Sequence, residues 1–195
     1  MTFKKITKVA VFIDYDNFTI TYSNHHKIDE ANISIWDSFN EKIISEYQKS
    51  FIKNDFEVIE HTGTWLCIGV SDFPSNEERE IKEKFERLDR KHGFIVNYGT
   101  RLNSYRDKKT GEFKLGKEKG VDSEIICQML MGAFQNHYDS CILVSDDGDY
   151  IPAVKRIQDF FGKKVIQAGF RNGRLRELAY AHIPFENTSK DLEFK

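Results

Sequence analysis

The stretch that decides the fold is Val9-Ala-Val-Phe-Ile13, which runs directly into Asp14-Tyr-Asp16-Asn17. Five consecutive apolar residues between polar neighbours predict a short strand that is buried on both faces. Strands of this kind are typical of parallel sheets, because helices cover both faces of such a sheet. The acidic residues that follow mark the carboxyl end of the strand. We therefore expect a buried parallel strand that ends in carboxylates.

Further apolar runs alternate with helical patterns along the rest of the chain. The predicted strands are residues 9–13, 65–70, 94–98, 141–144 and 164–168. Apolar residues at three- and four-residue steps predict helices at 32–52, 122–136, 151–161 and 173–181, and a charged helix around Ile81, Phe85 and Leu88. This alternation predicts an α/β fold, a three-layer sandwich with a five-stranded parallel sheet. In the expected order 3-2-1-4-5 the first and fourth strands are neighbours, and ligands bind where the order reverses.

Length and composition limit the class of protein. A chain of 195 residues fits a single domain over 1–195, with a core at about 7–183 and a polar C-terminal tail. With 39% hydrophobic residues the chain is not disordered, and with 29 basic against 31 acidic residues it is not a polycation. No apolar stretch approaches the ~20 residues of a membrane span. Cys67, Cys127 and Cys141 lack metal-ligand spacing, so we expect buried free thiols in a soluble cytoplasmic protein.

Acidic residues gather where two of the predicted strands end. The first strand is followed by Asp14 and Asp16, and the fourth by Asp146-Asp147-Gly148-Asp149. A further acid, Asp122, opens the helix over 122–136, where the helix dipole favours a carboxylate. Because the two strands are expected to be neighbours, these acids should lie near one another at the same edge of the sheet.

Carboxylates that are brought close together need a compensating charge. At about 4 Å and an effective dielectric constant of about 20, each like-charge pair costs about 4 kcal/mol. A lone Asp after a strand is usually a helix cap or turn former, and Asp-Asp-Gly-Asp alone is also compatible with a turn or a calcium loop. Acids at both strand ends together with a third acid favour a site for Mg²⁺ or Mn²⁺, which select oxygen ligands. Such an ion can activate water against a phosphodiester.

Three segments together resemble the NYN domain family, in the LabA-like branch of the PIN-like ribonucleases. In chain order they are Phe12-Ile-Asp14-Tyr-Asp16-Asn17, Lys119-Gly-Val-Asp122, and Leu143-Val-Ser-Asp-Asp147-Gly-Asp149-Tyr-Ile-Pro152 with Gly162-Lys-Lys-Val165. The resemblance covers roughly residues 7–183 and implies a PIN-like sheet with a metal-dependent ribonuclease site. It implies that the catalytic and metal-binding acids are Asp14, Asp122, Asp147 and Asp149, with Asn17 and Ser145 as supporting polar groups.

The sequence departs from the family pattern at two positions. The family commonly has a small residue where Asp146 stands, which makes this site more acidic than usual. It often has a second acid six residues after the one that matches Asp122, and here that position is Gln128. Glu124 is the nearest substitute, but two residues along a helix correspond to about 200° around it. One bound metal is therefore favoured over two.

The segment between the third strand and Asp122 is polar and basic. Lys109-Thr-Gly-Glu112 predicts the turn of a β-hairpin insertion, and Tyr98, Tyr105 and Phe113 are interleaved with the charges. Three acids in this segment leave a local net charge of about +4. Basic side chains follow a phosphate backbone and aromatic rings stack on unpaired bases. The predicted RNA-binding residues are Arg101, Arg106, Lys108, Lys109, Lys114, Lys117 and Lys119. An ordinary solvated loop is the alternative.

Three functions compete at this point. The first is a Mg²⁺- or Mn²⁺-dependent endoribonuclease that cleaves single-stranded RNA, with RNA as partner and no membrane; a homo-oligomer is compatible with the sequence. The second is an RNA-binding or regulatory module with a degenerate site, which Gln128 favours. The third is a haloacid-dehalogenase-like phosphatase, although that motif requires Thr or Val where Phe18 stands. Its site would use Asp14, Asp16, Lys119, Asp146 and Asp147.

Overall fold

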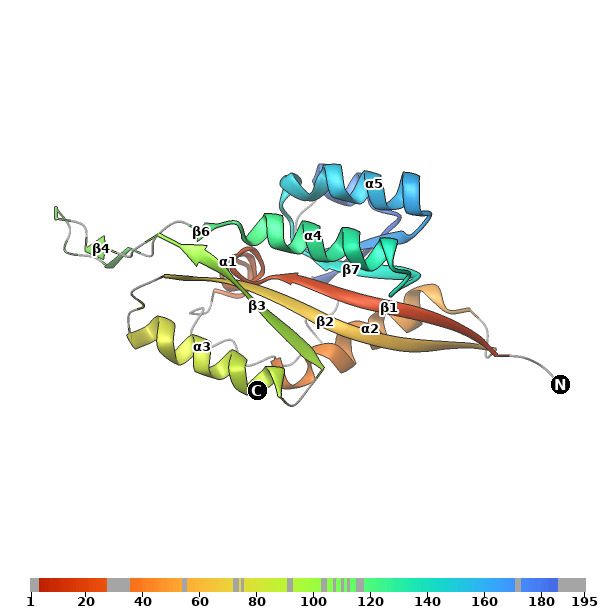
Figure 1. The fold of residues 1–195 in the computed structure, drawn as a ribbon, viewed down its shortest axis with the longest axis horizontal. Coiled ribbons are helices and arrows are strands. Elements are labelled where there is room, and N and C mark those ends of the chain that lie inside the picture. The colour runs from red at the N-terminus through yellow and green to blue at the C-terminus, as the bar shows by residue number, and fades with distance from the viewer. Residues whose placement is uncertain are drawn as a thin grey trace.

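The protein is built around one twisted, mostly parallel sheet (Figure 1). The computed structural model describes residues 4–27, 36–53, 56–71, 74, 76–90, 93–102, 105–106, 108–109, 111, 113–114, 118–170 and 173–185. The strand order is β6-β3-β2-β1-β7-β8-β9, and only β6 of these runs antiparallel to its neighbour within the described chain. The strands are β1 (Lys5–Asp14), β2 (Glu57–Ser71), β3 (Phe94–Arg101), β6 (Glu118–Lys119), β7 (Ser140–Val144), β8 (Lys164–Gly169) and β9 (Ala181–Pro184).

The predicted order of the first five parallel strands is confirmed, and β9 adds a sixth that the sequence analysis missed. The helix expected over 173–181 is shorter, because α6 (Arg174–Leu178) ends before β9 begins. β9 has four residues, of which only Ile183 is fully buried. So short a run has no readable period, and its strand structure comes from pairing with β8. The polar tail at 186–195 lies outside the described residues.

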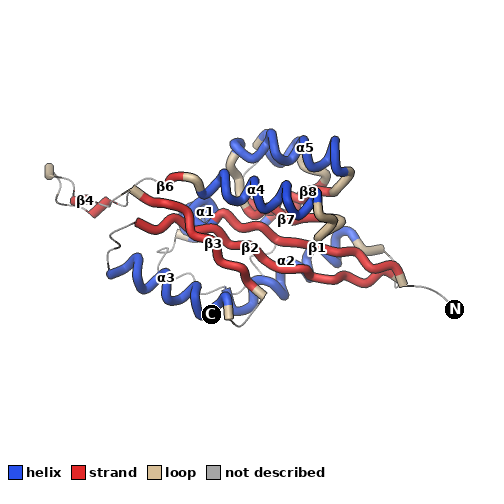
Figure 2. The backbone as a smooth tube through the Cα atoms, in the orientation of Figure 1, coloured by secondary structure: helices blue, strands red, loops and turns tan. Residues whose placement is uncertain are grey.

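Helices cover both faces of the sheet, which confirms the three-layer sandwich (Figure 2). One core lies under α1 (Tyr15–His26), α2 (Trp36–Phe51) and α3 (Asn76–Asp89). The other lies under α4 (Val121–Phe134), α5 (Ile151–Phe161) and α6. Alternation along β1 divides its side chains between the cores: Val9, Val11 and Ile13 contact the first, Ala10 and Phe12 the second. The same alternation turns Asp14 towards the α4 face.

Helix α1 follows β1 without a loop and was not predicted. Its buried positions include Thr19 and Thr21 alongside Phe18, so it lacks a clear apolar stripe. The helix starts because Asp14 caps it, with the Asn17 N–H donating to Asp14 Oδ1 at 3.1 Å. The cap therefore joins the end of β1 to α1 and holds the Asp14 carboxylate in place.

The predicted basic hairpin is present as a separate two-stranded sheet. β4 (Tyr105–Arg106) pairs antiparallel with β5 (Phe113–Lys114), and the hairpin extends away from the main sheet (Figure 1). Of the predicted turn residues, Thr110 and Glu112 lie outside the described chain. The chain then returns as β6 beside β3 and enters α4 through Gly120, whose φ of 81° is a conformation that favours glycine. The hairpin thus leads directly to Asp122.

Two remaining expectations concern the cysteines and the membrane. Cys67 and Cys141 are buried thiols outside any disulfide, as predicted, and burial raises the pKa of Cys141 to about 12. Cys127 is exposed, so the expectation of a buried thiol is wrong there, because this residue lies on the outer face of α4. Within the described chain, no helix has both the length and the apolar character needed to span a bilayer.

Candidate functional site

Asp14 is the centre of the polar cluster at the carboxyl ends of the strands. It is the last residue of β1 and is 4% exposed. Besides the cap to α1, its Oδ2 accepts hydrogen bonds from Ser145 Oγ at 3.3 Å and from the Tyr150 hydroxyl at 3.0 Å. These donors come from the segment after β7, which neighbours β1. The predicted convergence of the two strand ends is therefore present at Asp14.

Burial without a cationic partner perturbs the Asp14 carboxyl. Desolvation raises its pKa to about 6, the hydrogen bonds from Asn17 and Tyr150 oppose the rise, and the charges of Asp122 and Asp16 add to it. Among the described residues, no Lys, Arg or His forms an ion pair with Asp14 or Asp122. A buried carboxylate in this condition is stabilised by a bound cation.

Asp122 reaches the same place from α4. It lies in the first turn of that helix, is half-buried, and its Oδ1 accepts a hydrogen bond from the Tyr150 hydroxyl at 3.1 Å. Desolvation raises its pKa, and the charges of Asp147 and Asp149 raise it further. Asp14 and Asp122 therefore share one hydrogen-bond donor, although they belong to separate segments of the chain.

Tyr150 is a residue of this polar cluster that the sequence analysis missed. Its side chain is fully buried in the α4–α5 core, and its hydroxyl lies within hydrogen-bonding distance of both carboxylates. One hydroxyl proton cannot satisfy two carboxylates at once, so one of them is always the weaker acceptor. The available signal was its place one residue after Asp149, at the start of α5.

Asp147 and Asp149 lie beside this pair, on a one-turn 3-10 helix (Gly148–Tyr150) and its cap. Asp147 accepts from the Asp149 N–H at 2.9 Å, and its own N–H donates to Ser145 Oγ at 3.1 Å. Asp147 is half-buried and Asp149 is exposed. Throughout the part of the chain that the structure describes, no three Asp, Glu, His or Cys side chains are grouped closely enough to hold a metal ion. The structure thus brings together Asp14 and Asp122, with the other two predicted acids nearby as charges.

Asp146, which stands where the family commonly has a small residue, bonds to residues on the side of β8 and not to the Asp14–Asp122 pair. Asp146 accepts hydrogen bonds from Gln167 Nε2 at 3.0 Å and from the Phe170 N–H at 3.1 Å, on the side of β8. Its own N–H donates to Asn17 Oδ1 at 2.9 Å. A Cβ at Gly169 would collide with the Asp146 carboxylate, so glycine is required for this approach. Asp146 and Asn17 therefore hold the start of α1 against the segment that follows β7.

Glu124 does not join the carboxylate pair either. Its Oε1 accepts a hydrogen bond from Gln128 Nε2 at 2.8 Å, one turn further along α4. Gln128, which stands where the family often has a second acid, therefore bonds to Glu124, the nearest substitute for that acid. Glu124 was a supporting candidate for the site, and in this geometry it does not take the place of the missing second acid.

We expect Asp146→Asn to destabilise the protein without abolishing metal binding. Asn has one carbonyl oxygen for two donors, so one of the hydrogen bonds from Gln167 and Phe170 is lost, at a cost of about 1–3 kcal/mol. Urea denaturation measures this cost, and calorimetric titration with Mn²⁺ measures the affinity. A loss of affinity as large as that of Asp14→Asn would place Asp146 in the metal site instead.

Arg101 was predicted to contact RNA, but the structure places it in the interior. It is 7% exposed, and its Nη2 lies 2.6 Å from Asp16 Oδ2. Its Nε donates to the Gly69 carbonyl at 3.1 Å and lies 3.8 Å from a Glu78 carboxylate oxygen. Arg101 is therefore an anchor at the root of the hairpin, because β3 ends there, and it is not a surface contact for RNA.

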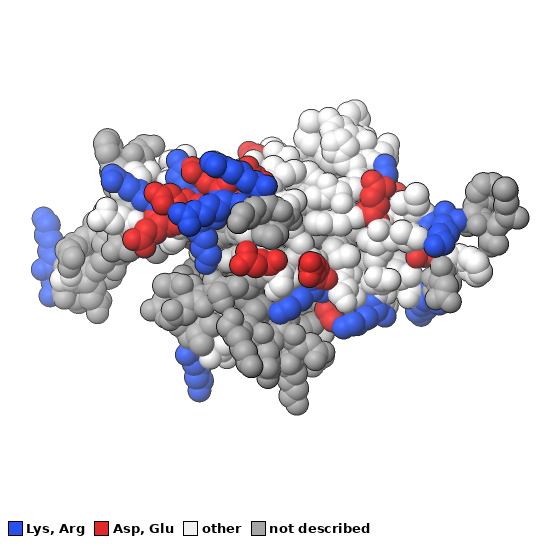
Figure 3. Space-filling view, turned by 90° about the horizontal axis from the view of Figure 1, so that it is seen from below, with Lys and Arg blue, Asp and Glu red and all other residues white. Residues whose placement is uncertain are grey.

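The remaining predicted RNA-binding residues lie on the hairpin and its return. Lys108, Lys109 and Lys119 are exposed. The backbones of Arg106 and Lys114 belong to β4 and β5, while their side chains and the whole of Lys117 lie outside the described part of the structure. By contrast, basic and acidic side chains are intermixed over α3 (Figure 3), so that helix does not present a basic surface.

Comparisons with known proteins agree with this architecture. The family model described as NYN domain matches residues 8–185. No curated protein matches the sequence. Among solved structures, a protein of unknown function from Vibrio parahaemolyticus is similar, with a TM-score of 0.57 and 19% identity over 91% of this chain and 92% of that one. The similarity to the Vibrio parahaemolyticus protein supports the fold alone. Because the family model spans nearly the whole described core, the chain belongs to the NYN domain family, a family of PIN-like nuclease domains.

Proposed function

We propose that this protein is a Mg²⁺- or Mn²⁺-dependent endoribonuclease that cleaves single-stranded RNA. One observation carries the proposal: Asp14 and Asp122, from distant segments of an NYN domain, meet at the Tyr150 hydroxyl without a cationic partner among the described residues. In a protein interior such a pair is costly unless a cation binds to it.

The donor set fits a hard divalent cation. Mg²⁺ is usually held by one or two carboxylates and keeps several of its waters, so Asp14 and Asp122 suffice as protein ligands. When bound, the ion supplies an activated water and stabilises charge on the phosphodiester. Asp147 and Asp149 add negative charge beside the pair. Tyr150 and Ser145 orient the Asp14 carboxylate, and Asn17 holds the neighbouring loop.

The hairpin supports RNA as the substrate. Lys108, Lys109 and Lys119 are exposed, and Lys119 lies three residues before Asp122 in the chain. Lysine contacts to phosphates supply affinity without sequence preference and position the strand. RNA held along this arm would be directed to the carboxylate pair.

The phosphatase alternative is not favoured by the geometry. It requires Asp16 and Asp146 to face the same centre as Asp14, whereas Asp16 pairs with Arg101 and Asp146 bonds to Gln167. An RNA-binding module without catalysis shares the hairpin with the nuclease. The nuclease and the RNA-binding module therefore differ in whether RNA is cleaved, and both bind RNA through the hairpin.

Incubation of the purified protein with end-labelled single-stranded RNA tests the proposal. We expect internal cleavage with Mg²⁺ or Mn²⁺ and complete inhibition by excess EDTA, because the proposal assigns the activation of water to the bound ion. RNA binding without cleavage in either metal would establish the RNA-binding module. Release of phosphate from p-nitrophenyl phosphate, with intact RNA, would establish the phosphatase.

A further inference from the structure

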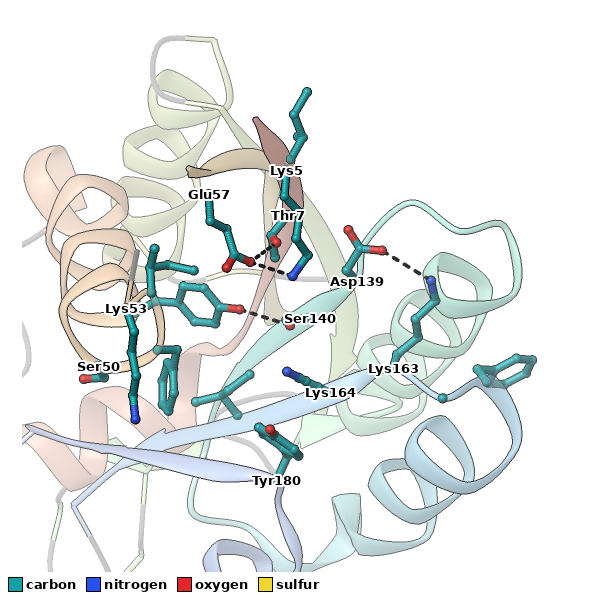
Figure 4. Close-up of a pocket in the computed structure, with 17 residues that line it drawn as sticks. Lys5, Thr7, Ser50, Lys53, Glu57, Asp139, Ser140, Lys163, Lys164 and Tyr180 are labelled. Atoms are coloured by element: carbon teal, nitrogen blue, oxygen red, sulfur yellow. Dashed lines mark hydrogen bonds and ion pairs between the residues drawn. The ribbon is translucent and has the colours of Figure 1, made fainter. Parts of the chain in front are cut away.

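A polar cavity lies at the opposite end of the sheet from the carboxylates. It has a volume of about 610 Å³ and is lined where strands begin, by Thr7 of β1, Glu57 of β2, Ser140 of β7 and Lys164 of β8 (Figure 4). Thr7 and Asp14 are seven residues apart along β1, which amounts to about 23 Å of strand. The cavity is therefore separate from the proposed nuclease site.

Both carboxylates in the cavity wall already have partners. Glu57 accepts hydrogen bonds from Thr7 Oγ1 and from Lys5 Nζ, the second at 2.9 Å, and these two bonds lower the pKa of Glu57. Asp139 lies 3.8 Å from Lys163 Nζ and accepts a hydrogen bond from a backbone N–H of β1 at 2.9 Å. These two pairs use two of the four lysines that line the cavity.

Neither of the other two lysines forms an ion pair with a carboxylate among the described residues, although the charge of Lys164 also helps to lower the pKa of Glu57. Lys53 follows the end of α2, and Lys164 begins β8, so they belong to different walls of the cavity (Figure 4). The Lys164 ammonium lies 4.7 Å from the centre of the Tyr180 ring. With two positive charges in excess, the cavity attracts an anion.

The rest of the lining suits a ring system. Phe51, Phe161 and Tyr180 provide aromatic surface. The buried Tyr47 hydroxyl donates a hydrogen bond to the buried Ser140 Oγ at 3.1 Å, and both residues add polar atoms to the lining of the cavity. The lining is thus mostly polar with aromatic rings among it, and the cavity's volume lies within the range of about 300–1,000 Å³ that small-molecule sites have.

We propose that this cavity binds a nucleoside phosphate, with the phosphate contacted by Lys53 and Lys164 and the base against the aromatic wall that includes Tyr180. The ligand is either a free nucleotide or the phosphorylated terminal nucleotide of an RNA strand, because both present the same chemistry. Binding here does not require the carboxylate pair, so the inference stands apart from the proposed nuclease activity.

Calorimetric titration of the full chain with adenosine 5′-monophosphate in EDTA tests this site. We expect binding to the wild type, and about tenfold weaker binding to each of Lys53→Gln and Lys164→Gln, because each removes one charged contact to phosphate. Lys155→Gln, an exposed lysine on α5 outside the cavity, is the matched control and should bind as the wild type does. Thermal melts establish that each variant is folded.

Competing ligands identify the source of the phosphate. A 5′-phosphorylated RNA oligonucleotide that binds with the same lysine dependence, while its 5′-hydroxyl form does not, identifies an RNA end; binding of the mononucleotide alone identifies a free nucleotide. The inference is overturned if the wild type does not bind the mononucleotide, if adenosine binds equally well, or if both lysine variants bind unchanged. Loss of binding in Asp14→Asn would assign the nucleotide to the carboxylate site instead.

Discussion

Asp14→Asn is expected to lower metal-dependent RNA cleavage by more than about a hundredfold. Removing a group that only supports a metal ligand costs up to about a hundredfold, and Asp14 is proposed as a ligand itself. The neutral amide cannot offset the charge of a divalent cation, while its size and its ability to cap α1 are retained. Initial rates of cleavage of a labelled RNA, at saturating Mn²⁺, measure the change. Wild-type rates in this variant would remove Asp14 from the proposed site.

The same substitution is expected to remove the pH dependence that Asp14 gives to the stability of the metal-free protein. The folded protein holds a proton on Asp14 with a pKa of about 6, compared with the usual 3.8. Because the folded state binds that proton more tightly than the unfolded chain, stability falls as the pH rises from about 4 to about 6 and stays lower above that range. At about 1.36 kcal/mol per pH unit, this lowers the stability by about 3 kcal/mol, which Asn does not incur.

Urea denaturation in EDTA at pH 4 and at pH 7 separates this effect from a general change in charge. Asn places an N–H donor where Asp14 Oδ2 accepts from Ser145 and Tyr150, so those hydrogen bonds are lost at both pH values. The stability of Asp14→Asn relative to the wild type should therefore be about 3 kcal/mol higher at pH 7 than at pH 4. Asp159→Asn, an exposed acid on α5, is the control and should show no such difference. A relative stability that is the same at both pH values would show that the buried carboxylate is already compensated without a cation.

Tyr150→Phe is expected to weaken Mn²⁺ binding by about 10–100-fold, the range for removing a hydrogen-bond partner of a metal-binding side chain. The ring still fills the core, but neither Asp14 nor Asp122 retains the donor that brings them together. Stability in EDTA should fall by about 1–3 kcal/mol, because a buried carboxylate loses a hydrogen bond. Calorimetric titration with Mn²⁺ measures the affinity.

Tyr138→Phe is the matched control for this effect. Tyr138 is fully buried in the same core, and its hydroxyl donates to the Met129 carbonyl at 2.6 Å, away from the carboxylates. It should lose similar stability and bind Mn²⁺ with unchanged affinity. Equal losses of affinity in the two variants would show that Tyr150 acts only through the packing of the core.

Local patterns predicted the elements that have a clear period. The apolar runs of β1 and β7 are buried on both faces, and the stripe of α5 predicts its bounds at 151 and 161. Elements without such a pattern were missed, as α1 and β9 show. In α1 the buried threonines hide the stripe, and β9 becomes a strand only because β8 offers it an edge.

The predicted site residues also divide into those that a local pattern identifies and those whose position depends on the fold. Asp14 and Asp122 could be identified because acids at strand ends and at helix starts are visible in the sequence. The inward position of Arg101 could not, because its partner Asp16 is 85 residues away and the sequence around it is otherwise basic. Asp146 looked like a member of the acidic site, and its bonds to Gln167 and Phe170 depend on the course of β8.

The sequence alone therefore determined the parallel α/β fold, the family and the set of candidate acids, because short apolar runs and motif spacing are properties of neighbouring residues. Only the tertiary structure decided which acids converge. The Tyr150 hydroxyl meets Asp14 across 136 residues and Asp122 across 28, and both contacts depend on the pairing of β1 with β7 and on the entry of α4 through Gly120. Contacts of this range are set by packing and strand register, which no local pattern encodes.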